Sequence, residues 1–133
     1  MSDNYFQFDL KTHITEKGNL TAVEFDDNLP FTPKRIYTVW DNKIARGGHC
    51  HKKEEEIFYM VNGSCKARLH NGKDEIIIDM KNHDKALYVA NYVWHEFYDF
   101  SDDSVMLCLS STHYNPNRED YIEDFNLFLE NVQ

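Results

Sequence analysis

Two histidines separated by one residue, His49 and His51, are the strongest candidates for chemistry in this sequence. On an extended strand their side chains project to the same face, while Cys50 between them points away. An imidazole with a pKa near ~6.5 can give or take a proton at neutral pH. The pair can therefore share the work of general acid and general base on one ligand. The alternative is that both are polar residues on the solvated face of a strand.

Short segments rich in β-branched and aromatic residues surround this pair and predict the strands that position it. Seven such segments lie at 35–40, 56–61, 64–70, 74–80, 85–90, 95–100 and 104–111. Asn62-Gly63 and Asn71-Gly72 separate successive segments, and both residue types tolerate the positive φ of tight hairpin turns. This number and spacing of strands predict an all-β barrel or sandwich.

The two ends of the chain follow other patterns. After Pro116 the apolar residues recur at helical spacing, which predicts a C-terminal α-helix packed on the barrel. The residues that carry this pattern are Tyr121, Ile122, Phe125, Phe128 and Leu129. Residues 20–26 have the pattern of a further strand, and the extreme N-terminus is left unassigned.

Composition limits the classes of partner. With 133 residues the chain has room for one hydrophobic core, so we expect one domain over residues 1–133. A formal net charge of -9 disfavours binding to nucleic acid. The sequence has neither a run of ~18 apolar residues nor a signal-peptide pattern, so we expect a cytoplasmic protein with no membrane partner. Cys50, Cys65 and Cys108 are odd in number and are expected to be free thiols.

The histidine segment matches the first signature of the cupins, HxHx4Ex6G. The matching residues are His49, His51, Glu56 and Gly63. The resemblance implies a small cupin barrel, which is a double-stranded β-helix or jelly roll with the histidines inside. The second cupin signature is weaker, because Ala90 and Tyr92 replace the expected proline and glycine, although His95 stands at its histidine.

A closer resemblance is to the sugar 3,4-ketoisomerases that act on dTDP-linked 4-keto-6-deoxyglucose. It covers residues 33–125 and is carried by RIY at 35–37, RGGHCHKK at 46–53 and VWHEFYDFSDDSVMLCLSS at 93–111. It implies an isomerase that moves a carbonyl from C4 to C3 of the hexose through an enediol. The expected substrate is dTDP-4-keto-6-deoxy-D-glucose and the product a dTDP-3-keto-6-deoxyhexose. Neither a cofactor nor a metal is expected.

The resemblance also assigns roles to individual residues. The catalytic set is His49 and His51, with His51 favoured as the base at C3, and Tyr37 in the network that binds the substrate oxygens. The expected substrate-binding set is Arg35, Arg46, Lys52, Trp94, His95 and Tyr98. The arginines suit a diphosphate, because a guanidinium makes bidentate contacts to phosphate, or they brace the site. His95 is assigned to the C4 configuration, favouring the galacto (xylo-hex-3-ulose) product. Trp94 and Tyr98 are equally consistent with aromatic packing.

The main alternative is a metal-dependent cupin in which His49, His51, Glu56 and His95 bind an ion. In its favour, the isomerase family is expected to carry glutamine at the position of Glu56. Against it, a metal would occupy the imidazole lone pairs that acid–base catalysis needs, and the acidic run 54–56 resembles a solvated strand entry. A sugar-nucleotide epimerase and a non-catalytic sugar-binding cupin are further alternatives.

The resemblance also predicts how the protein is assembled and used. Small cupins commonly pair through their sheets, so we expect a homodimer in which the aromatic segment 5–8 covers an edge of the partner. The product is expected to pass to an aminotransferase that installs a 3-amino group for a cell-surface glycan.

Overall fold

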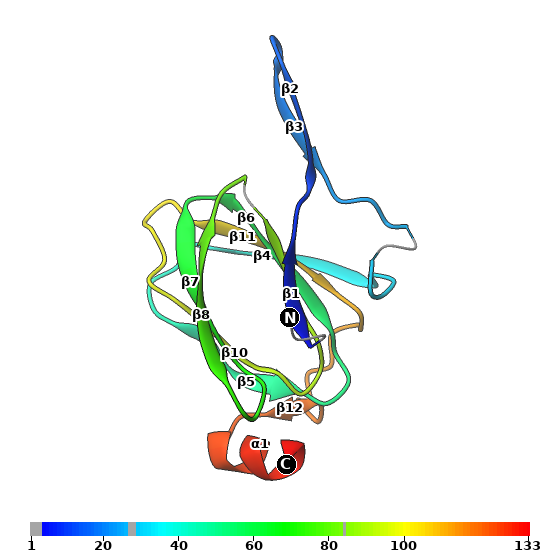
Figure 1. Ribbon diagram of the computed structural model, residues 1–133, viewed down its shortest axis with the longest axis vertical. Coiled ribbons are helices and arrows are strands. Elements are labelled where there is room, and N and C mark those ends of the chain that lie inside the picture. The colour runs from blue at the N-terminus through cyan, green and yellow to red at the C-terminus, as the bar shows by residue number, and fades with distance from the viewer. Residues whose placement is uncertain (1–3, 27–28, 84) are drawn as a thin grey trace.

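The computed structural model describes residues 4–26, 29–83 and 85–133, and its core is two antiparallel five-stranded sheets that enclose an elongated interior (Figure 1). Across the first sheet the order is β1 (Tyr5–Phe8), β9 (Ala86–Val89), β6 (Glu56–Asn62), β11 (Val105–Ser110) and β4 (Arg35–Trp40). Across the second it is β12 (Tyr121–Ile122), β5 (Arg46–His51), β10 (Trp94–Tyr98), β7 (Ser64–His70) and β8 (Glu75–Lys81). This is the predicted cupin architecture.

Alternation of side chains along the strands builds the interior. The inward residues of both sheets form one apolar cluster, which includes Phe58, Met60, Leu69, Val89 and Phe97. The outer face of β6 is also covered, because Ile57 packs in a second cluster against side chains of the N-terminal segment such as Phe6 and Phe8. Burial on both faces explains why β6 is apolar almost throughout.

All seven predicted strands are confirmed, with ends shifted by at most two residues. The two Asn-Gly turns are also confirmed, because Gly63 and Gly72 have φ of 71° and 98°. The histidine segment forms β5 and points Cys50 away from the interior, into a cluster with Ile122 and Phe128. All three cysteines are buried free thiols, as expected.

The C-terminal helix is shorter than the sequence pattern predicts. It is α1 (Phe125–Val132), and it begins after Asp124, whose carboxylate accepts a hydrogen bond from Leu127 N at 2.9 Å. Tyr121 and Ile122 are not helical, so their assignment to the helix is wrong. They pair with β5 as β12, because the main chain of β5 offers hydrogen-bonding groups on that edge.

A two-stranded hairpin projects from one end of the barrel (Figure 1). It consists of β2 (Lys11–Thr15) and β3 (Gly18–Ala22), so the strand expected at 20–26 lies earlier in the chain. Every residue of β2 is exposed. Among the described residues, no helix is long and apolar enough to cross a membrane.

Candidate active site

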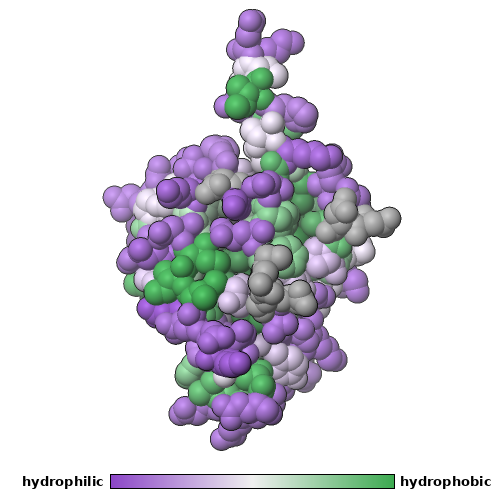
Figure 2. Space-filling model, viewed as in Figure 1, coloured by the Kyte–Doolittle hydropathy of each residue, from purple (hydrophilic) through white to green (hydrophobic). Residues whose placement is uncertain are grey.

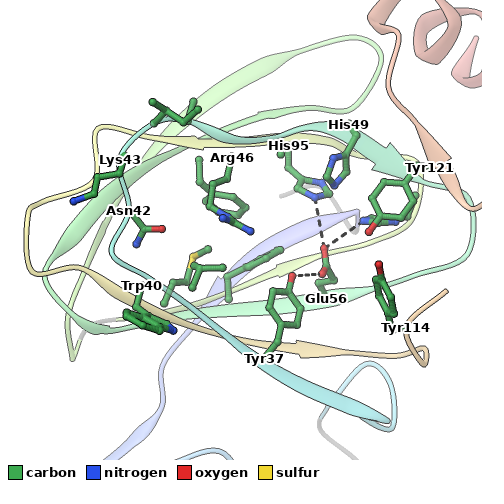
Figure 3. Close-up of a pocket in the computed structure, with 18 of the residues that line it drawn as sticks. Tyr37, Trp40, Asn42, Lys43, Arg46, His49, Glu56, His95, Tyr114 and Tyr121 are labelled. Carbon is green, nitrogen blue, oxygen red and sulfur yellow. Dashed lines mark hydrogen bonds and ion pairs between the residues drawn. The ribbon is translucent and has the colours of Figure 1, made fainter. Parts of the chain in front are cut away.

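A cavity of about 830 Å³ occupies the space between the two sheets. Inward-facing side chains of β4, β5, β6 and β10 line it, and so does the loop that joins β4 to β5. Figure 3 shows a polar end around His49, His95 and Glu56 and an opposite end with Asn42 and Lys43. The polar end contains the residues whose types and spacing predicted chemistry.

Pairing of β5 with β10 brings the third histidine to the first two. His49 lies directly opposite His95 across the strands, and their ring centroids are 4.9 Å apart. Gly47 makes this close approach possible: its φ is 85°, and a Cβ there would lie 2.8 Å from the carbonyl oxygen of His95. A bulge in the pairing follows His95.

His51 is almost fully enclosed, with 3% of its surface exposed. Its Nε2 lies 3.6 Å from Glu56 Oε2 on the cavity side. Its Nδ1 lies 3.2 Å from Glu54 Oε2 and 3.3 Å from Asp120 Oδ2. The ring of Tyr121 packs edge-on against the imidazole at 4.4 Å between centroids. One nitrogen of His51 therefore faces the cavity and the other faces two carboxylates.

Glu54 and Glu56 are each only 4% exposed, so the interpretation of 54–56 as a solvated strand entry is wrong for both. Glu54 forms an ion pair with Arg35, with Nη2 to Oε1 at 2.5 Å, and Ser110 donates to the same oxygen. Glu56 accepts a hydrogen bond from the Tyr37 hydroxyl at 2.6 Å. Both carboxyl groups turn inward because they find partners on β4, β5 and β11.

Burial controls the charge states of these groups. It lowers the pKa of His49 to about 3, that of His51 to about 2 and that of His95 to about 4, with neighbouring charges contributing to the first two. Burial, assisted by Glu54, raises the pKa of Glu56 to about 8. Burial, followed by Glu56, raises the pKa of Tyr37. At neutral pH the three imidazoles are therefore uncharged.

Six of the nine residues singled out from the sequence line the cavity. They are Arg35, Tyr37, Arg46, His49, His51 and His95. Trp94 and Tyr98 do not, because they alternate with the inward His95 and Phe97 and so point outward. Trp94 packs on Phe125 and Phe128 of α1, and Tyr98 lies beneath the guanidinium of Arg68.

The side chain of Lys52 is also outside the main cavity. Lys52 follows β5, is exposed, and lines a smaller hollow on the surface. The placement of Lys52, Trp94 and Tyr98 gives no support to their predicted contact with substrate.

Sequence reasoning missed four residues of the site. Asp120 faces His51 and accepts hydrogen bonds from the main-chain N–H groups of Lys53 and Glu54. The others are Tyr114, Arg118 and Tyr121, which line the cavity. They follow the last long strand, where the sequence pattern indicated only a helix. No periodic signal places them near the histidines.

Within the described part of the chain, two sets of side chains are close enough to share a metal ion. The ligand atoms of His49, His51 and His95 lie within 4.8 Å of one another, and so do those of His51, Glu54 and Glu56. The same lone pairs are those that proton transfer requires, so the two uses of the site exclude each other.

Comparisons with known proteins agree with the chemistry that the site geometry indicates. A family model described as "FdtA: WxcM-like, C-terminal" matches residues 3–133. A curated protein of Aneurinibacillus thermoaerophilus, named TDP-4-oxo-6-deoxy-alpha-D-glucose-3,4-oxoisomerase, is 40% identical over 120 residues, which are 89% of this chain and 85% of that protein.

Two solved structures extend this likeness to three dimensions. WlaRA of Campylobacter jejuni, a TDP-fucose-3,4-ketoisomerase, has a TM-score of 0.89 at 33% identity and covers 98% of this chain and 96% of its own. A mutant of the 3,4-ketoisomerase QdtA of Thermoanaerobacterium thermosaccharolyticum, in complex with TDP-4-keto-6-deoxyglucose, has a TM-score of 0.90 at 31% identity, covering 99% and 96%.

Proposed function

Since this chain belongs to the FdtA family and is a sugar 3,4-ketoisomerase, we propose that it converts dTDP-4-keto-6-deoxy-D-glucose to a dTDP-3-keto-6-deoxyhexose. The observation that carries the proposal is the set of uncharged histidines, half-buried His49 and buried His51 and His95, at one end of a large cavity. Uncharged imidazoles can accept a proton from carbon and return it, and the reaction requires both steps.

His51 is the base that removes the proton from C3. The adjacent C4 ketone makes this proton acidic, and its loss gives an enediol after a proton reaches O4. When Nε2 of His51 gains the proton, the imidazolium lies beside Glu54 and Asp120 at Nδ1. Carboxylates in that position stabilise the charged ring and fix its orientation. The geometry therefore supports His51 in this role.

His49 and Tyr37 complete the proton transfers. His49, whose ring centroid is 4.9 Å from that of His51, serves C4 of the enediol. The Tyr37 hydroxyl lines the same end of the cavity and belongs to the network that moves a proton from O3 to O4. Its raised pKa keeps the phenol protonated, so it acts as a hydrogen-bond donor.

The nucleotide end of the substrate lies toward the opposite end of the cavity. Arg35 is committed to Glu54 and braces the histidine end. Arg46 and Lys43 line the cavity beyond it and supply the positive charge that a diphosphate needs. No binding contact is assigned to Lys52, Trp94 or Tyr98.

The proposed product has the galacto (xylo-hex-3-ulose) configuration at C4. The support is His95, which lines the cavity directly opposite His49 and whose position is expected to vary between histidine and arginine in this family. Which face of the enediol receives the proton depends on the side chains around C4.

The protein is proposed to act as a cytoplasmic homodimer whose product supplies an aminotransferase for a cell-surface glycan. In this structure β1 pairs with β9 of its own chain, so segment 5–8 covers its own sheet. Exposed apolar side chains elsewhere support pairing of two copies: Ile36 and Trp40 on edge strand β4 and Ile14 and Leu20 on the hairpin. Figure 2 shows apolar surface on the projecting hairpin.

Proton NMR of the sugar in D₂O tests the function. EDTA-treated protein is incubated with dTDP-4-keto-6-deoxyglucose, with His51→Asn in parallel. Loss of the H3 signal and a new, deuterated C4 position, both absent in the variant, are expected, and the coupling constants give the configuration of the product. Turnover only after a metal is restored would favour the metal-dependent cupin instead. Exchange at C3 with the carbonyl still at C4 would favour an epimerase, and no exchange would favour a binding protein.

A further inference from the structure

The buried carboxyl group of Glu56 lies between the two histidines on the cavity side, at a position where the family is expected to carry glutamine. Its Oε1 accepts the hydrogen bond from Tyr37 at 2.6 Å. Its Oε2 lies 3.5 Å from His95 Nε2 and 3.6 Å from His51 Nε2. The role of Glu56 depends on which of these three atoms carries a proton.

His95 has its proton on the other nitrogen. Its Nδ1 lies 3.0 Å from the main-chain carbonyl oxygen of Val93. A carbonyl oxygen can only accept, so Nδ1 carries the hydrogen. The ring is uncharged, because burial lowers its pKa to about 4. His95 Nε2 therefore presents a lone pair to Glu56.

The same reasoning applies to His51. Its Nδ1 has two carboxylate oxygens within 3.3 Å, from Glu54 and Asp120. Neither contact has the alignment of a hydrogen bond, but both oxygens attract a proton to Nδ1. An uncharged imidazole has one N–H, so His51 Nε2 also presents a lone pair to Glu56.

An ionised Glu56 would be a third hydrogen-bond acceptor beside the two acceptor nitrogens, His95 Nε2 and His51 Nε2, with no hydrogen between them. A carboxylic acid would instead supply the one donor that the cluster needs. Other ionisable groups that face Glu56 also affect whether it is protonated. They are Arg35, Tyr37, Glu54, Cys108 and Tyr121. Burial and Glu54 outweigh the hydrogen bond from Tyr37 and the charge of Arg35, and they raise the pKa of Glu56 to about 8, in agreement with the hydrogen-bond count.

We propose that Glu56 is a positioning residue that works as an uncharged carboxylic acid: it accepts from Tyr37 and donates its O–H to Nε2 of His95. This donor holds His95 with its proton on Nδ1 and leaves Nε2 of His51 free for substrate. A glutamine side chain offers the same pattern, since its oxygen accepts and its NH₂ donates. The kinetic consequence of this inference rests on the proposed function. Its structural consequence, the protonation of the histidine rings, does not.

Substitutions that separate shape from hydrogen bonding test the kinetic consequence. With EDTA-treated protein at pH 7, Glu56→Gln should keep kcat within about threefold of the wild type, whereas Glu56→Met, which has no donor, should lose about 10²-fold in kcat with little change in KM. Above pH 8 the wild type should lose activity as Glu56 ionises, and Glu56→Gln should not. A Gln variant as inactive as the Met variant would overturn the proposal, as would a fully active Met variant.

A second measurement needs no substrate and so separates this inference from the proposed function. Nitrogen-15 NMR of histidine-labelled protein reports which ring nitrogen carries the proton. The wild type and Glu56→Gln should both show protonated Nδ1 and a hydrogen-bonded, unprotonated Nε2 at His95, while in Glu56→Met the Nε2 signal of His95 should move to the position of an imidazole nitrogen without a hydrogen bond. Protonated Nε2 in the wild type would overturn the proposal. If the wild type gives the expected spectrum yet does not turn over the sugar nucleotide, only the proposed function fails.

Discussion

The histidine end of the cavity and the β2–β3 hairpin both depart from the usual distribution of side chains, in opposite ways: polar groups are buried in one and apolar groups are exposed in the other. His51 inside the barrel is 3% exposed and has three carboxyl groups within 3.6 Å. On the hairpin, Ile14 is 80% exposed and Leu20 59%. In the barrel, polar side chains are fixed by partners from the same chain. On the hairpin, apolar side chains face solvent, which supports the proposed pairing of two copies.

The largest expected effect comes from removing the base at the buried end. His51→Asn should lower kcat by about 10³-fold or more, because general base catalysis at C3 is lost while the fold is kept. NMR measures the loss of turnover, and the circular dichroism spectrum shows whether the fold is kept. The matched control is His83→Asn, an exposed histidine with φ of 59° that asparagine tolerates, and it should turn over normally. Equal loss in both variants would contradict the assignment.

Placing the same charge in the apolar core of the barrel and on the hairpin compares the two environments directly. Met60→Asp buries an unpaired carboxylate in the core and should lower the free energy of unfolding by about 4 kcal/mol. Leu20→Asp on the hairpin should leave the barrel within about 0.5 kcal/mol of the wild type and dissociate the proposed dimer instead. Urea titration measures the first effect and light scattering the second. A Leu20→Asp protein that stays dimeric would remove the hairpin from the interface.

Acid should destabilise the barrel through its interior histidines. Their pKa values are lowered from about 6.5 to between about 2 and about 4, so the unfolded chain binds protons first as the pH falls below 6.5. Stability is therefore lost on acidification, by up to about 1.4 kcal/mol per pH unit for each histidine. Replacing the interior His95 by Asn should reduce this slope in urea titrations between pH 6.5 and 5. Equal slopes in His95→Asn and the wild type would contradict the prediction.

The pKa of Glu56 is shifted in the opposite direction, so it has the opposite effect on how stability depends on pH. It is raised from 4.5 to about 8, so its contribution to stability is complete below pH 4.5 and is lost as the pH rises through 8. Glu56→Gln should therefore be more stable than the wild type at pH 8, by on the order of 2 kcal/mol, and the difference should vanish toward pH 4.5. Melting curves at several pH values measure it. A difference independent of pH would show that Glu56 is already ionised.

The smallest effect is expected where the cavity meets solvent. Arg46→Ala should raise KM for the sugar nucleotide by about tenfold and leave kcat within about twofold, because a contact to the diphosphate binds ground state and transition state alike. Steady-state kinetics separate the two constants. A fall in kcat with unchanged KM would place Arg46 at the reacting sugar.

Local patterns in the sequence predicted much of the fold and the centre of the site. Strand composition, Asn-Gly turns and the single residue between His49 and His51 are local features, and each determined a local structure that the protein has. The helix was predicted too long because Tyr121 and Ile122 are apolar at helical spacing, yet they pair with β5. The spacing of apolar residues within a segment carries no information about a distant strand edge whose main-chain groups can pair with that segment.

By itself, the sequence determined that His49 and His51 share a face, because side-chain alternation is a property of one strand. Only the tertiary structure decided that this face lines a cavity, that His95 lies opposite His49, and that Trp94 beside it packs on α1. It also decided that Glu54 and Glu56 are buried and that Asp120 reaches His51. The physical reason is that strand register and the closure of two sheets set which distant residues meet, and those contacts govern burial and charge.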